Sequence, residues 1–156
     1  MMTYLPKEEG ISENIALKGR IGTLHKRTIS EEWVFNTVVN AGKGQITGLI
    51  NQVVTTPFLW AAIGTGAAAP GTTQTALVAE MMRGSATCTR QTTVFTNDTA
   101  QWVYTFNAGS AYAIAEAGIF DASGSASGNM LARGTFATVN MASGDSLQIT
   151  YKIQIT

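Results

Sequence analysis

Residues 147–156 read Leu147-Gln-Ile-Thr-Tyr-Lys-Ile-Gln-Ile-Thr156, and this stretch decides the class of fold. Apolar side chains occupy every second position from Leu147 to Ile155, and polar side chains fill the positions between them. Side chains alternate between the two faces of a strand, so a strand here has one apolar and one polar face. A helix would scatter the same apolar residues around its circumference. The sequence therefore predicts a closing β-strand with one buried face.

Two further strands are expected just upstream. Tyr112–Phe120 is apolar on both faces apart from Glu116, which is typical of a strand covered on both sides. The turn-rich segment 121–128 separates it from a strand over 129–136, and Ser143-Gly-Asp145 makes the final turn. We therefore expect a three-stranded meander at this end of the chain, with other strands covering its apolar side.

Length and composition indicate one domain. The chain has 156 residues, of which 45% are hydrophobic and 13% charged, and it contains 16 glycines, a profile that suits β-structure with tight turns. Ten basic and ten acidic side chains cancel, so no electrostatic attraction to nucleic acid or to an anionic membrane is expected. No apolar run approaches the roughly 20 residues that span a bilayer, and the start of the chain lacks a signal-peptide pattern. We expect a soluble protein made in the cytoplasm.

The rest of the chain reads as alternating strands and turns. A short amphipathic helix is expected around Ile46, Leu49, Ile50 and Val53, and Pro57 stops it. Thr75–Arg83 is expected to form one or two helical turns with Leu77 and Met81 facing inward. Strands are expected at 15–24, 26–39, 58–63, 86–96 and 100–106, the last two forming a hairpin around Asn97-Asp98. Seven to nine strands and one helix predict a mainly β fold, a single antiparallel β-sandwich or barrel-like domain.

Residues 1–14 are expected to form a flexible N-terminal arm, and residues 15–156 the β-rich globular domain. The arm is polar, is broken by Pro6 and Gly10, and has neither a helical nor a strand period. Such a segment buries too little apolar surface to offset the entropy lost on ordering. Its apolar residues Tyr4, Leu5 and Ile11 are then expected to be anchors that bind a partner.

A loose dinucleotide pattern, Gly64-x-Gly66-x-x-Ala69, follows the strand at 58–63. Pyrophosphate binding requires a helix N-terminus directly behind such a loop, and Pro70-Gly71 intervenes here. We therefore interpret the loop as structural and expect no nucleotide or other cofactor.

Catalytic residues are hard to assemble from this sequence. Glu116 and Asp121 are the best carboxylate pair for acid–base chemistry. Glu116 is better explained by an ion pair with an arginine such as Arg133 or Arg83, or by exposure to solvent at a sheet edge. With such a structural role, Glu116→Gln is expected to change stability only modestly. His25, the one histidine, is expected at the surface, far from these carboxylates. Cys88, the one cysteine, is expected to be a small core residue, and it excludes a disulfide framework and a multi-cysteine metal site. We expect no catalytic site and no metal site.

Several segments together resemble structural proteins of tailed bacteriophages. They cover about residues 33 to 156 and are 58–71, 75–83, Ala115-Glu-Ala-Gly-Ile-Phe-Asp121, Met130-Leu-Ala-Arg-Gly-Thr-Phe136 and Gly144-Asp-Ser-Leu-Gln-Ile-Thr-Tyr-Lys-Ile153. Similar segments occur in capsid decoration (cement) proteins and in tail-fibre or baseplate components. The resemblance implies a protein of the virion that is not an enzyme.

A compact domain with an arm favours decoration over an elongated tail fibre. The expected partners are the major capsid protein and neighbouring copies of this chain, as a homotrimer on the capsid surface of the virion. A tail-fibre or baseplate component is the alternative. A small carbohydrate-binding domain using Trp33, Trp60 and Trp102 is a third reading, although tryptophans on alternating strands are more often core residues.

Overall fold

The computed structural model describes residues 17–25 and 28–156, with side chains at Ile21 and from Val34 onward. The described part contains nine strands and one helix, so the expected mainly β fold with one short helix is confirmed. In chain order the elements are β1 (Leu17–His25), β2 (Thr28–Val38), α1 (Asn40–Ile50), β3 (Trp60–Gly64), β4 (Glu80–Ser85), β5 (Thr87–Gln91), β6 (Thr99–Asn107), β7 (Tyr112–Phe120), β8 (Met130–Met141) and β9 (Ser146–Ile155).

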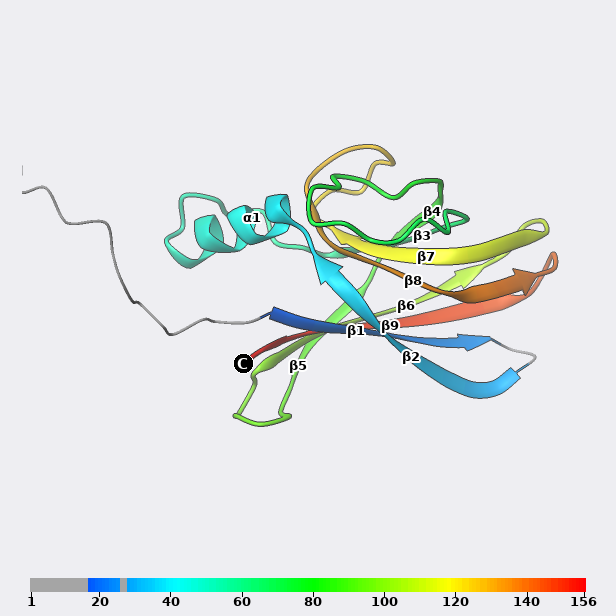
Figure 1. The fold of residues 1–156 in the computed structure, drawn as a ribbon, viewed down its shortest axis with the longest axis horizontal. Coiled ribbons are helices and arrows are strands. Elements are labelled where there is room, and N and C mark those ends of the chain that lie inside the picture. Colours follow the sequence, from blue (N-terminus) through cyan, green and yellow to red (C-terminus); the bar gives the residue numbers. More distant parts are fainter. Residues whose placement is uncertain (1–16, 26–27) are drawn as a thin grey trace, which may run out of the picture.

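Two antiparallel sheets pack together as a sandwich (Figure 1). One sheet has the strand order β2-β1-β9-β6-β5, and the other has the order β4-β3-β7-β8-β2. Strand β2 belongs to both, because its residues up to Asn36 pair with β1 while Thr37 and Val38 pair with β8. On the opposite side only Ala86 separates β4 from β5, and its N–H donates to the carbonyl of Leu59 at 2.8 Å. The sandwich is therefore barrel-like, with the chain crossing between the sheets on both sides.

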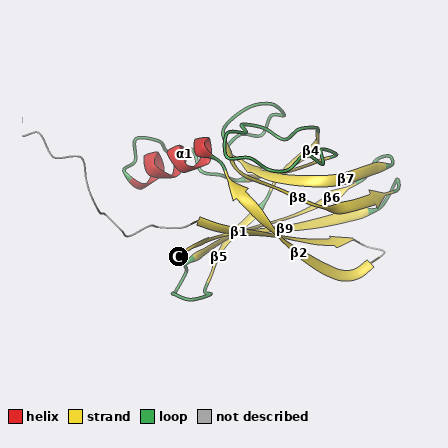
Figure 2. Cartoon of the chain, viewed as in Figure 1, coloured by secondary structure: helices red, strands yellow, loops and turns green. Residues whose placement is uncertain are grey.

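The alternation in the closing strand is confirmed. Leu147, Ile149, Tyr151 and Ile153 are buried on one face of β9, and only the terminal Ile155 is half exposed. Strand β7 is buried on both faces from Ile114 to Phe120, as its sequence predicts. The long loop that contains Leu77 covers its outer face, as Figure 2 shows, and α1 packs against the neighbouring strand β8 at one end of the sheet.

The prediction of a three-stranded meander is wrong for its last strand. Strands β7 and β8 pair as expected, but β9 pairs with β1 and β6 in the other sheet. The turn from Ala142 to Asp145 thus carries the chain from one layer to the other. Apolar alternation is a local signal that specifies a strand and its buried face but not the neighbouring strand. Strand β9 covers the apolar side of the β7–β8 pair instead of extending it.

Two helical predictions also need correction. The segment Thr75–Arg83 forms no helical turns, because Glu80–Ser85 is a strand that pairs with β3. Leu77 is buried as expected, but Met81 is 44% exposed. In α1, Ile46 and Leu49 pack against the core, whereas Ile50 lies at the solvent-exposed end. The helix ends at Ile50, with Asn51 as its C-cap and Gln52, which has a positive φ of 61°, directly after it. Val53 therefore lies outside the helix, and Pro57 is not its stop.

Candidate functional site

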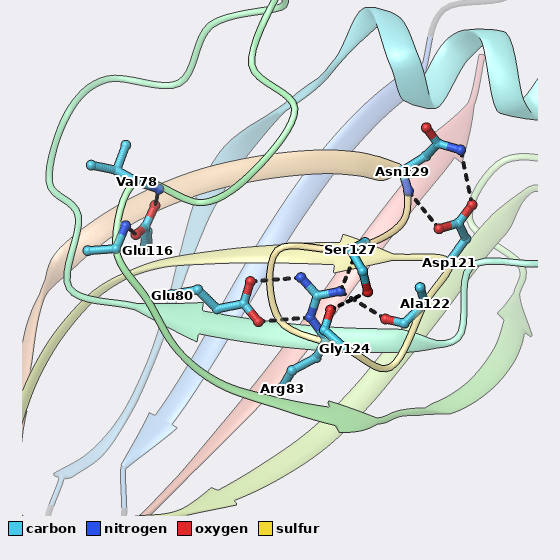
Figure 3. A network of polar contacts seen from close by, with 10 residues as sticks. Val78, Glu80, Arg83, Glu116, Asp121, Ala122, Gly124, Ser127 and Asn129 are labelled. Atoms are coloured by element: carbon cyan, nitrogen blue, oxygen red, sulfur yellow. Dashed lines mark hydrogen bonds and ion pairs between the residues drawn. The ribbon is translucent and has the colours of Figure 1, made fainter.

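Glu116 lies in the buried middle of β7, and both of its carboxylate oxygens accept hydrogen bonds. Its Oε1 accepts hydrogen bonds from the N–H groups of Gly66 (3.0 Å) and Ala79 (2.8 Å). Its Oε2 accepts from the N–H of Val78 (3.0 Å) and from Nε of Arg133 (2.7 Å). Both side chains of the ion pair are completely buried, so the expected pairing with an arginine is confirmed with Arg133. Figure 3 shows the loop N–H groups converging on this carboxylate.

The glycine-rich loop encloses this carboxylate. A Cβ atom on Gly64 or Gly66 would overlap Glu116 Oε1, so both positions need glycine for close approach. The nucleotide fingerprint uses glycines to admit a phosphate. Here the same spacing admits a carboxylate of the protein itself, which agrees with the structural interpretation of the loop.

A second polar cluster holds the turn between β7 and β8 (Figure 3). Arg83 forms a two-pronged ion pair with Glu80 at 2.8 and 2.7 Å and donates through Nη1 to the carbonyls of Ala122 (2.8 Å) and Ser127 (3.0 Å). Its guanidinium also lies over the ring of Phe120, 3.7 Å from the centroid. The arginine therefore fixes the loop from both ends.

Asp121 belongs to a separate group and does not share hydrogen-bond partners with Glu116. It accepts from the backbone N–H of Asn129 at 2.6 Å and from the side chains of Asn129 and Gln45. Gln45 is a buried residue of α1, so this group fastens the helix to the β7–β8 turn. Glu116 and Asp121 thus serve two different structural networks. No group of three or more His, Cys, Asp or Glu side chains within the described residues could hold a metal ion.

Cys88 is exposed, so its prediction as a core residue is wrong. It lies on the short strand β5, whose side chains are mostly exposed, and burial on one side raises the pKa of its thiol. Trp102 is buried and donates through Nε1 to the carbonyl of Phe58 at 2.7 Å, while Trp60 is half-buried. The side chains of Trp33 and His25 lie outside the described part of the structure, as do Tyr4, Leu5 and Ile11.

A largely apolar pocket of about 540 Å³ opens at one end of the sandwich. It lies between α1, the segment leading into β3, and strands β5, β6 and β9. Its apolar lining includes Leu49, Phe58, Leu59, Trp102, Ile153 and Ile155, and Cys88, Arg90 and Asp98 add polar groups. The buried Glu116–Arg133 pair does not line it. The site predictions from sequence missed this pocket, because its lining comes from residues 46–59, 88–102, Leu131 and 153–155, which are far apart in the chain.

Apolar surface continues from the pocket to the segments beside it. Nine large hydrophobic side chains in the described part are exposed. Two of them, Leu59 and Ile155, line the pocket, and four others belong to segments that adjoin its lining: Ile50, Val53, Val94 and Phe95. These six residues define its apolar rim. The loop that carries Val94 and Phe95 is held by Asp98, whose carboxylate accepts both of their N–H groups, at 2.7 and 3.0 Å. Burial acts to raise the pKa of Asp98, but these hydrogen bonds and those from Thr93 outweigh it and hold the pKa far below its usual range.

The pocket also lies where the described chain begins. Leu17, the first residue of β1, pairs with Ile155 of β9, and Ile155 lines the pocket. Figure 1 shows the start of β1, the C-terminus and α1 at the same end of the sandwich. The segment that precedes Leu17 therefore joins the domain at the rim.

Comparisons of the chain with protein-family models, with curated proteins and with solved structures give no significant match. Within the described residues, no helix is both long and apolar enough to cross a membrane.

Proposed function

We propose that this protein is a non-enzymatic structural protein of tailed-bacteriophage virions that decorates the outer surface of the capsid shell. The observation that carries the proposal is the apolar pocket with its exposed apolar rim, placed where the N-terminal segment joins the domain. Exposed apolar residues gathered at one site are typical of a surface that binds another protein. A decoration protein needs such a surface to hold neighbouring subunits together.

The polar residues of the phage-like segments support a structural role. Glu80, Arg83, Glu116, Asp121 and Arg133 all lie in those segments, and each makes hydrogen bonds that hold loops or strands in place. A catalytic carboxylate needs a free position for substrate, whereas the four hydrogen bonds to Glu116 come from the protein itself. The contacts of these residues thus support a structural role for each of them, and none of the contacts requires a chemical reaction.

The N-terminal arm supplies the second part of the proposal. Burying Tyr4, Leu5 and Ile11 on a partner gains about 1.5–3 kcal/mol for each side chain. Ordering the backbone costs about 1–2 kcal/mol for each residue, so side-chain burial alone does not order the arm. Main-chain hydrogen bonds to the edge of a partner's sheet would make up the difference. The arm is therefore proposed to bind the major capsid protein or a neighbouring copy of this chain.

We propose a homotrimer as the state on the shell, because the chain has no net charge and offers an apolar surface for self-contact. Analytical ultracentrifugation of the free protein and of protein detached from virions tests this. A stable monomer in both samples would exclude the trimer.

The experiment that tests the function measures binding to isolated virion parts. Emptied capsids that lack the protein are mixed with it and sedimented, and purified tails are the matched control. Decoration predicts saturable co-sedimentation with capsids and a higher temperature of capsid disruption. Binding to tails but not to capsids would favour the tail-fibre or baseplate alternative and overturn decoration.

A further inference from the structure

The apolar pocket has the features of a binding site for a short apolar peptide segment. Its volume of about 540 Å³ lies within the range of about 300–1,000 Å³ for sites that enclose a ligand. Leu59 is 40% exposed and Ile155 is 52% exposed, so apolar surface continues from the lining to the rim. A segment with two or three apolar side chains would cover both.

We infer that the pocket receives the apolar residues Tyr4, Leu5 and Ile11 from the arm of a neighbouring copy of this chain. The inference rests on the proposed function, which places several copies side by side. It deepens that function by naming the pocket as the site that accepts the arm.

The arm matches the pocket in composition and charge. Its adjacent apolar residues Tyr4 and Leu5 are followed closely by Glu8 and Glu9, and the pocket lining includes Arg90. Apolar side chains would enter the pocket while the carboxylates approach the Arg90 guanidinium of the lining and Lys7 approaches Asp98. Such opposite charges favour one orientation of the bound segment over the other.

The direction of β1 favours exchange between copies. Strand β1 starts at the pocket end of the domain and runs away from it. A return into the same pocket requires the chain to reverse among the residues that precede Leu17, whereas contact with a neighbouring copy does not. The 16 residues before Leu17 span up to about 50 Å when extended, which is enough to reach another copy.

Cys88 provides a reporter for this contact. It is the one cysteine of the chain, it is exposed, and it lines the pocket. The test measures the rate at which a bulky maleimide labels Cys88 in the full-length protein over a wide range of protein concentrations. A neighbour's arm slows labelling as concentration rises, by about tenfold when the concentration is ten times the dissociation constant. The Leu5→Asp variant keeps the fast rate throughout, and Thr3→Ser, a matched control on the same arm, behaves as the unchanged protein.

Two outcomes overturn the inference. A labelling rate that is independent of concentration and equal in the unchanged protein and in Leu5→Asp shows that the arm does not cover the pocket. A rate that is slow in the unchanged protein but independent of concentration shows that each arm covers its own pocket.

Disulfide cross-linking gives a second, independent readout. In the Leu5→Cys variant, mild oxidation is expected to link the introduced thiol to Cys88 of another copy, giving dimers and longer species on a non-reducing gel. The double variant Leu5→Cys/Cys88→Ser, which retains only the introduced thiol, shows how much cross-linking occurs without Cys88. If oxidation gave only monomers with a disulfide inside one chain, exchange between copies would be overturned.

Neither readout requires capsids, so the two proposals fail separately. Concentration-dependent protection of Cys88 without capsid binding would refute decoration and leave the arm contact standing. Capsid binding with an unprotected Cys88 would refute the arm contact alone.

Discussion

Arg133 Nε lies 2.7 Å from Glu116 Oε2. The two residues belong to the neighbouring antiparallel strands β8 and β7, and both side chains are completely buried. Replacing Glu116 by Gln leaves the guanidinium charge buried without an opposite charge. Removing one partner of a buried pair costs about 3–5 kcal/mol, so the structure replaces the modest effect expected from sequence with a severe one. Urea unfolding of Glu116→Gln measures the loss. A loss below about 1 kcal/mol would contradict this account.

The Tyr151 hydroxyl is buried in β9 and has no hydrogen-bond partner among the described residues. A buried polar group without a partner costs about 1–3 kcal/mol, so Tyr151→Phe is expected to keep or raise the melting temperature at neutral pH. Tyr112→Phe, on a half-buried tyrosine, is the control. A clear fall in melting temperature for Tyr151→Phe would show that the hydroxyl is bound.

The same residue predicts an alkaline transition. Burial raises the pKa of Tyr151 well above its usual value, and the nearby charge of Arg133 only partly offsets this. A raised pKa in the folded state means that the contribution to stability is present below the unfolded value of about 10 and is lost as pH rises above it. Melting curves from pH 8 to 11 are therefore expected to fall more steeply for the unchanged protein than for Tyr151→Phe. Parallel curves would show that another group controls alkaline unfolding.

Helix α1 depends on a close contact at Gly42. A Cβ atom there would overlap the backbone of Leu131 in β8, whereas Gly44, one half-turn later, has open space around it. Gly42→Ala is expected to destabilise by about 1–3 kcal/mol, because the helix must move away from the sheet. Gly44→Ala is the matched control and is expected to stabilise by about 0.5–1 kcal/mol. Thermal unfolding of both variants tests the difference in sign.

Local patterns in the sequence predicted strands and their buried faces well. The alternation in β9 and the apolar run in β7 each reflect the burial of side chains that are near in sequence. The partner of β9 could not be predicted, because pairing with β1 joins residues about 130 positions apart, such as Ile21 and Tyr151. Likewise, Glu80–Ser85 has a helix-compatible sequence that becomes a strand through pairing with β3.

The ion pair was predictable and the pocket was not. A lone carboxylate in an apolar strand requires a counter-charge, and Arg133 lies in the next strand of the hairpin. The pocket depends on where α1, β5 and β9 meet, which no short-range pattern specifies. Cys88 was misplaced for a related reason: strand β5 leaves most of its side chains in solvent, and its flanking threonines do not reveal this.

Asp98 makes the rim of the pocket sensitive to acid. Because its pKa is lowered in the folded state, its contribution to stability is present above the unfolded value of about 3.9 and is lost as pH falls below it. Asp98→Asn is expected to be less stable than the unchanged protein at pH 7 and to lose less stability between pH 5 and pH 2. Thr96→Ala, in the same exposed loop, is the control. Equal losses on acidification in Asp98→Asn and the unchanged protein would exclude this role.

The arm is expected to matter for assembly and not for folding of the domain. Deleting residues 1–14 leaves the two sheets and the first residue of β1, Leu17, in place. The melting temperature of the dilute protein is therefore expected to stay almost unchanged. Attachment to capsids and the stability of decorated particles are expected to fall, because the apolar anchors Tyr4, Leu5 and Ile11 are lost. Co-sedimentation and thermal disruption of particles measure both effects, and a truncated protein that decorates as tightly as the full chain would show that the arm takes no part in attachment.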